Sequence, residues 1–145
     1  MAQTITKGYQ ALLDEAKSLV STISVDEAAA LLDSDKHVFI DLRDIREMQR
    51  AGKIPGAFSC PRGMLEFWID PASPYHKDIF NQDKTYIFYC ASAWRSALSA
   101  QQAQLMGLKP VVHIEGGFTA WAKAEKPTEA VEKKYPPQKA NALAL

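Results

Sequence analysis

The chain opens with two segments whose apolar positions follow a helical period. Between residues 5 and 20, apolar side chains recur every three or four positions, the spacing that lines one face of a helix. This predicts an amphipathic helix at the start of the chain. Ser24 and Glu27 have the spacing of an N-terminal capping box, and the apolar run from Ala28 to Leu32 follows them. A second, short helix is expected there.

Three later segments are nearly continuous apolar runs, which is typical of parallel strands covered on both faces. They span residues 37–42, 85–89 and 110–114, and each precedes a segment with helical character, at 44–50, 95–106 and 118–125 respectively. The repeated order of strand then helix predicts an α/β fold. We expect a three-layer domain with a mainly parallel sheet of about five strands flanked by helices.

The remaining segments carry turn signals. Residues 52–57 contain two glycines and a proline and lead into a short strand at 58–60, which Pro61 terminates. Residues 71–83 form a polar connection with a possible helical turn. We therefore expect an N-terminal helix over 1–20 packed on the domain, the domain itself over 21–126, and a C-terminal tail over 127–145 that is extended on the surface or partly disordered.

Composition narrows the class of protein. The 145 residues carry 17 Lys plus Arg against 17 Asp plus Glu, and no basic block is present, so no nucleic-acid or membrane partner is expected. No apolar run approaches the ~18 residues of a membrane-spanning helix. Two cysteines are too few for a disulfide framework, and the N-terminus lacks the apolar run of a signal peptide, which predicts a cytoplasmic protein.

Cys90 is the main candidate for chemistry, because it falls between an apolar strand and a helix. In open α/β sheets, sites form at the carboxyl ends of strands, where the next helix exposes unpaired N–H groups. These groups and the helix dipole favour a thiolate, the nucleophilic form of cysteine. The small residues Ala91, Ser92 and Ala93 would let the backbone curl around an anion, with Arg95 adding charge at the rim. The alternative is that Cys90 is a small buried hydrophobe.

Four motifs carry a resemblance to the rhodanese (sulfurtransferase) family. Two are Asp41-Leu42-Arg43-Asp44 with Glu47 and the turn Gly52-Lys53-Ile54-Pro55-Gly56-Ala57, whose Lys53 stands where the family usually has histidine. The others are the run from Phe88 to Leu98 and the run from His113 to Trp121. These motifs follow one another at family spacing from about Ser21 to Lys123. The sequence is therefore identified as similar to a single rhodanese-like domain.

The resemblance implies sulfur transfer through a persulfide on Cys90. Its thiolate would attack the outer sulfur of a donor such as thiosulfate, and a nucleophile such as cyanide or a thiol would then take that sulfur. The N–H groups of Ala91, Ser92, Ala93, Trp94, Arg95 and Ser96 would hold the persulfide, and Arg95 would help to hold an anionic donor. The expected partners are a small-molecule donor and acceptor, with a protein as a possible acceptor. No cofactor and no metal are implied.

Two other functions stay open. One is a non-catalytic or regulatory sulfur-carrier module that delivers sulfur to a protein partner, because Ala91 and Ala93 replace a basic residue and a glycine of the best-known rhodanese loops. The other is a phosphatase or arsenate reductase. Those relatives place five residues between cysteine and arginine, whereas only four, Ala91 to Trp94, separate Cys90 from Arg95 here. The shorter loop favours sulfur transfer.

Several further residues have a structural interpretation beside a functional one. Arg43 and Glu47 have the spacing of an ion pair on a helix, and Arg43 and Arg62 are possible supporting charges near the site. Cys60 is expected in or near the core. The three histidines lack metal-ligand spacing, and His113 is expected to be a satisfied core residue. Four aromatic residues are expected in the core or at its rim: Phe67, Trp68, Phe118 and Trp121. Trp94 could select a hydrophobic donor, shield the persulfide or contact a protein.

Overall fold

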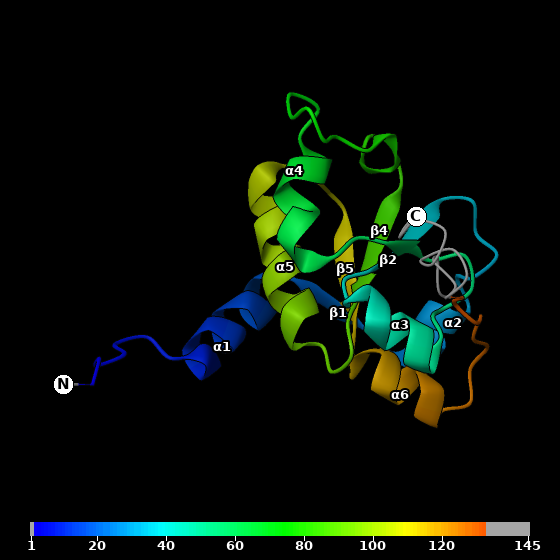
Figure 1. The fold of residues 1–145 in the computed structure, drawn as a ribbon, viewed down its shortest axis with the longest axis horizontal. Helices are drawn as coiled ribbons and strands as arrows, with labels where there is room; N and C mark the ends of the chain where they lie inside the picture. The colour runs from blue at the N-terminus through cyan, green and yellow to red at the C-terminus, as the bar shows by residue number, and fades with distance from the viewer. Residues whose placement is uncertain (1, 133–145) are drawn as a thin grey trace, which may run out of the picture.

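A five-stranded parallel sheet lies at the centre of the computed structural model, which describes residues 2–132 (Figure 1). The strand order is β1-β5-β4-β2-β3, and every pair of neighbouring strands is parallel. The central strand is therefore β4, which runs directly into Cys90. The strands are β1 Ser21–Ile23, β2 His37–Asp41, β3 Phe58–Ser59, β4 Thr85–Tyr89 and β5 Val111–Ile114.

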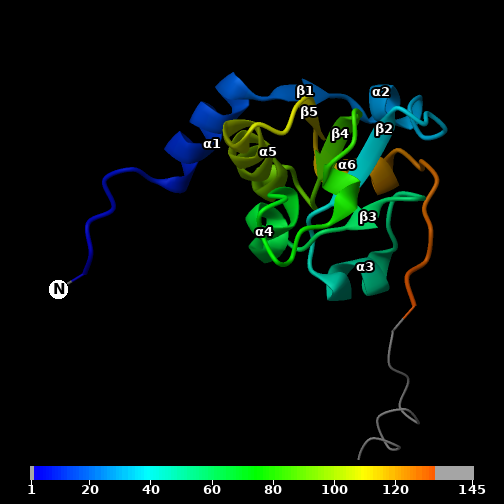
Figure 2. The ribbon, with the colours of Figure 1, turned by 90° about the horizontal axis from the view of Figure 1, so that it is seen from above.

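Helices cover both faces of this sheet, which confirms the predicted α/β architecture. They are α1 Tyr9–Leu19, α2 Val25–Ala29, α3 Ile45–Ala51, α4 Leu65–Ile69, α5 Trp94–Met106 and α6 Gly117–Lys123, with short 3₁₀ turns η1 Arg62–Met64 and η2 Asp78–Phe80. Figures 1 and 2 show α1, α4 and α5 gathered toward one side of the sheet and α2, α3 and α6 toward the other. No helix within residues 2–132 has the length and apolar character needed to cross a membrane.

Successive side chains of a strand point to opposite faces of the sheet, and this divides the core into two layers. Tyr86 and Phe88 of β4 point toward the layer that contains α5 and α4, whereas Ile87 and Tyr89 point toward the layer that contains α2 and α6. All four of these side chains are buried. Both faces of β4 are thus covered by apolar groups, which is why its sequence is continuously apolar rather than alternating.

Most elements lie where the hydrophobic pattern places them, but β1, α4 and the 3₁₀ turn η1 were not predicted. The capping box of Ser24 and Glu27 is formed, and Gly107 ends α5 in the left-handed conformation. The predicted helical turn in 71–83 is present as η2. Sequence patterns did not reveal β1, because an edge strand of two exposed residues and one half-buried residue carries almost no periodic signal. They also did not reveal the five-residue α4.

Both flanking segments contact the domain. Leu13 and Ala16 of α1 pack against Ala97 of α5. Of the predicted tail, residues 127–132 are described, and there Glu129 exchanges backbone hydrogen bonds of 2.8 and 2.9 Å with Lys53. The indole N–H of Trp121 also donates to the carbonyl of Pro127 at 2.7 Å. The expectation for the tail beyond Glu132 lies outside the described residues.

Candidate active site

Cys90 lies at the carboxyl end of the central strand, in the loop that enters α5. It is fully buried, with 0% of its surface exposed. Its Sγ lies 3.2 Å from the backbone nitrogen of Ala93 and 3.4 Å from that of Ser96, and both N–H groups are directed at the sulfur. Because these groups belong to the start of a 13-residue helix, the sulfur also lies at the positive end of the α5 dipole.

A left-handed residue gives the loop its tight curvature. Ala93, the N-cap of α5, has φ 79° and ψ 0°, a conformation that costs an L-residue roughly 1 kcal/mol or more. This conformation directs the N–H of Ala93 inward to Sγ instead of outward to solvent. Strain of this kind persists where the surrounding structure imposes it, as it commonly does at functional sites.

The start of α6 supports the loop from beneath. The N–H of Phe118 donates to the carbonyl of Cys90 at 2.7 Å, and the N–H of Thr119 donates to that of Ala91 at 3.0 Å. A Cβ on Gly117, whose φ is +60°, would lie 2.5 Å from the Cys90 oxygen, so only glycine allows this approach. The two motifs that predicted the site, around Cys90 and around Gly116-Gly117, therefore contact each other directly.

Arg95 is paired with a carboxylate. Its Nη1 and Nη2 donate to the two carboxylate oxygens of Glu47, at 2.8 and 2.9 Å. These hydrogen bonds hold the pKa of Glu47 down at about 2, below its ordinary value. The pair connects the start of α5 to α3, and within it the two charges offset each other.

The predicted ion pair between Arg43 and Glu47 is wrong. Arg43 instead binds Asp41, with Nη2 to Oδ2 at 2.6 Å and Nε to Oδ1 at 2.9 Å, and it donates to the carbonyl of Gly52 at 2.8 Å. The reason is that Arg43 precedes the N-cap of α3, Asp44, so the helical spacing does not apply to it. Arg43 is 2% exposed, and its guanidinium lies over the ring of Phe118. Its role is therefore that of a buried structural residue beside the loop.

Two other candidates, Arg62 and Cys60, have their hydrogen-bond partners outside the Cys90 loop. Arg62 forms a bidentate pair with Glu66 at 2.8 and 3.2 Å, a contact made within η1 and α4. Cys60 lies in the core, as expected, and burial raises the pKa of its thiol to about 12. Of the four aromatic residues expected in the core or at its rim, Phe118 and Trp121 are buried, whereas Phe67 is 53% exposed.

His113 connects the back of the loop to β1. Its Nδ1 lies 3.0 Å from the hydroxyl of Ser96, and its Nε2 lies 3.0 Å from the hydroxyl of Thr22. Burial, assisted by the charge of Lys17, lowers the pKa of His113 to about 4, so the ring is neutral near pH 7. The expectation of a satisfied core histidine is met, and the same side chain also orients Ser96. Within residues 2–132, no three His, Cys, Asp or Glu side chains gather as metal ligands would.

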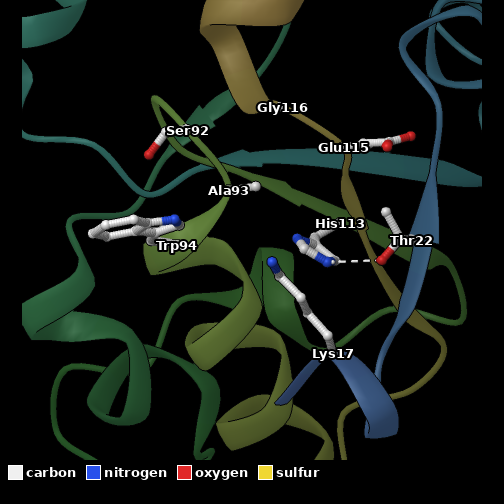
Figure 3. A pocket seen from close by; sticks show the side chains of 8 residues that line it. All are labelled: Lys17, Thr22, Ser92, Ala93, Trp94, His113, Glu115 and Gly116. Atoms are coloured by element: carbon white, nitrogen blue, oxygen red, sulfur yellow. Dashed lines mark hydrogen bonds between the residues drawn. The ribbon is translucent and has the colours of Figure 1, made fainter. Parts of the chain in front are cut away.

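A pocket of about 440 Å³ opens beside the loop. Figure 3 shows that its walls come from the loop, from β5 and from the N-terminal segment. Sequence reasoning named the loop residues and His113 but missed three members of this wall, Lys17, Thr22 and Glu115. The signal was weak, because Thr22 lies on the missed strand β1 and Lys17 lies on the polar side of α1. A smaller pocket of about 200 Å³ adjoins Ala91, Arg43 and Arg50.

Comparisons with known proteins agree with this architecture. The family model described as "Rhodanese-like domain" matches residues 24–124. Protein slr1261 of Synechocystis is 30% identical over 107 residues, which cover 74% of this chain and 55% of that protein. "Probable adenylyltransferase/sulfurtransferase MoeZ" of Mycobacterium tuberculosis is 32% identical over 74% of this chain and 26% of its own length. The chain thus spans about half of the first relative and a quarter of the second.

A solved structure from Rhodopseudomonas palustris is 60% identical to this chain. It superposes with a TM-score of 0.87 and covers 89% of this chain and 99% of its own. That protein is described as one of unknown function and a possible tyrosine phosphatase. Since the rhodanese-like model spans well over half of the residues, including the Cys90 loop and its Gly116-Gly117 support, the chain belongs to the rhodanese-like domain family.

Proposed function

We propose that the protein is a rhodanese-type sulfurtransferase in which Cys90 carries the sulfur as a persulfide. The observation that carries this proposal is the position of Sγ, which accepts hydrogen bonds from the backbone N–H groups of Ala93 and Ser96 at the start of α5. Backbone N–H groups and a helix N-terminus stabilise a thiolate and, after sulfur has been transferred, the terminal sulfur anion of a persulfide. The sulfurtransferase name of a relative agrees with this chemistry.

The reaction proceeds in two displacements. The Cys90 thiol loses its proton to solvent, and the thiolate attacks the outer sulfur of thiosulfate. A sulfur–sulfur bond forms to Cys90, the sulfur–sulfur bond of thiosulfate breaks, and sulfite leaves with the electron pair of that bond. Cyanide or an acceptor thiolate then attacks the outer persulfide sulfur and releases the Cys90 thiolate. Such covalent catalysis divides one difficult transfer into two easier ones.

The burial of Cys90 sets a condition on this mechanism. With 0% of the residue exposed, a donor reaches Sγ only when the loop or the side chains at its rim move. Trp94 is 53% exposed at this rim, and its indole would cover the persulfide once the donor has left. A persulfide that is covered in this way is protected from water and from stray thiols until the acceptor binds.

The second candidate is a phosphatase, favoured by the description of the 60% identical structure. Its difficulty is space, because Cys90 and Arg95 enclose only four residues and Arg95 already holds Glu47 at 2.8 Å. A tetrahedral oxyanion needs both a wider ring of N–H groups and a free guanidinium. A sulfur carrier that serves a protein partner remains compatible with the same persulfide and differs only in its acceptor.

Steady-state assays separate these functions. Thiocyanate formation from thiosulfate and cyanide is expected to follow a double-displacement rate law, to vanish in Cys90→Ser and to persist in Cys60→Ala. In parallel, an aryl phosphate is offered to the same three proteins. Phosphate release that depends on Cys90, without thiocyanate formation, would show that the protein is a phosphatase and not a sulfurtransferase.

A further inference from the structure

The pocket beside the Cys90 loop is built in part by residues outside the family region. It is lined by Lys17, Thr22, Ser92, Ala93, Trp94, His113, Glu115 and Gly116. Of these, Lys17 lies on α1 and Thr22 on β1, both before residue 24, where the match to the family model begins. The N-terminal segment therefore adds a wall, and a charge, that the rhodanese-like domain alone would lack.

Lys17 places its ammonium group at this pocket. In Figure 3 its Nζ points inward, toward the space between Trp94 and His113. None of the carboxylates described in the structure forms an ion pair with it, unlike the paired Lys7, Lys53 and Lys126. The charge of Lys17 reaches into the pocket, since it contributes, after burial, to the low pKa of His113. The ammonium is thus available to an anion bound there.

Contacts at both ends of α1 fix the position of Lys17. Leu13 and Ala16 pack against Ala97 of α5, and the ring of Tyr9 lies 5.2 Å from the ring of Trp94. Beyond the helix, β1 pairs with β5, with Thr22 opposite His113. Because Lys17 directly follows the buried Ala16, its backbone is held against the same helix that begins at the catalytic loop.

The loop itself offers an anion no free side-chain charge. Ala91, Ser92 and Ala93 are neutral, and Arg95 is neutralised by its bidentate pair with Glu47. We propose that Lys17 fills this role: its ammonium binds the anionic group of the sulfur donor in the pocket beside Trp94. The inference rests on the proposed sulfur transfer and specifies how the donor is bound.

The dimensions and charges of the pocket indicate the class of donor. Its volume of about 440 Å³ lies in the range of ~300–1,000 Å³ that is typical of sites for organic ligands and is generous for the five heavy atoms of thiosulfate. Glu115 lies on the same pocket, and its negative charge disfavours a compact dianion. A donor with a carboxylate for Lys17 and an organic body against the Trp94 indole fits better. The preferred donor is therefore an organic persulfide, whose outer sulfur passes to Cys90 as its thiolate leaves, or a 3-mercapto-2-oxo acid. In the second case the carbon–sulfur bond breaks, and the carbon fragment leaves with the electron pair of that bond as an enolate.

The test compares donors across charge variants of the full chain. For Lys17→Met we expect KM to rise about tenfold with 3-mercaptopyruvate and with glutathione persulfide, with a smaller change in kcat, since one charge-assisted contact is lost. Lys17→Arg should restore most of the affinity. Lys123→Met removes the same charge from an exposed position on α6 and should leave KM unchanged. Arg50→Met removes a charge from the smaller pocket and should have less effect than Lys17→Met.

Each other result has a defined meaning. An unchanged KM in Lys17→Met, or an equal rise in Lys123→Met or Arg50→Met, would overturn the role of Lys17 while sulfur transfer stands. A rise with thiosulfate as large as that with the organic donors would overturn the donor class. If the wild-type protein forms no persulfide with any of the three donors, the proposed function fails, and this inference with it.

Discussion

Gly117 lies directly against the backbone of Cys90, so that a Cβ at Gly117 would be 2.5 Å from the Cys90 carbonyl oxygen. The next residue donates its N–H to that same oxygen at 2.7 Å. The loop that holds the reactive sulfur is therefore supported by the first turn of α6, which follows a different strand. The shape of the loop depends on the absence of a side chain at one distant position.

We predict that Gly117→Ala destabilises the protein by about 2–4 kcal/mol, because it combines a left-handed backbone with a clash against backbone atoms. Gly56→Ala is the matched control, since Gly56 also has a positive φ, +77°, but a Cβ there meets nothing within 4 Å. That control should lose only about 1 kcal/mol. Urea unfolding of both variants measures the difference, and equal losses would show that the contact with Cys90 carries no energetic weight.

Replacing Glu47 tests the neutralisation of Arg95. In Glu47→Gln the Arg95 charge becomes available to an anion, so KM for thiosulfate should fall by about threefold to tenfold, whereas loss of a partly exposed ion pair should cost about 1 kcal/mol of stability. Glu66→Gln breaks the comparable pair with Arg62 and should leave KM unchanged. A KM that stays constant or rises in a folded Glu47→Gln protein would show that Arg95 does not bind the donor and only connects α5 to α3.

His113 should make stability depend on pH. Its pKa is about 4 in the folded protein against an ordinary value of 6.5, so the unfolded chain binds the extra proton as pH falls below about 6.5. The contribution of His113 to the free energy of unfolding is thus fully present above pH 6.5, and about 3 kcal/mol of it is lost as the pH falls to 4. Glu47, with its pKa of about 2, loses its own contribution to the free energy of unfolding in a lower pH range. His113→Gln should flatten the upper range and His37→Gln should not. A decline that persists unchanged in His113→Gln would refute this assignment.

Cys60 should take no part in sulfur transfer. Its thiol is buried and has a pKa of about 12, so it remains protonated and unreactive near neutral pH. Cys60→Ala is expected to keep the thiocyanate-forming rate within about twofold while losing about 1 kcal/mol of unfolding free energy from the lost packing. A loss of turnover in a folded Cys60→Ala protein would instead make Cys60 a second redox or sulfur-relay thiol.

The elements that sequence could predict are those with a strong local signal. The apolar run of β4 and the Ala-rich helix ending at Gly107 locate Cys90 at a helix N-terminus before any coordinates are known. The partner of Arg43 could not be found in this way, because it depends on where α3 begins and on burial beneath the loop. Lys17 was missed for a related reason. Its position at the pocket arises from packing of α1 on α5 and from pairing of β1 with β5, both of which are long-range.

The most direct test of the account is the intact mass of the protein after brief incubation with thiosulfate, 3-mercaptopyruvate or glutathione persulfide. We predict the gain of one sulfur atom with at least one donor, its location on Cys90 by peptide mapping, and its release as thiocyanate when cyanide is added. Cys90→Ser should gain nothing, and Cys60→Ala should behave as the wild-type protein. No gain of sulfur in the wild-type protein, or a gain that survives in Cys90→Ser, would contradict the account.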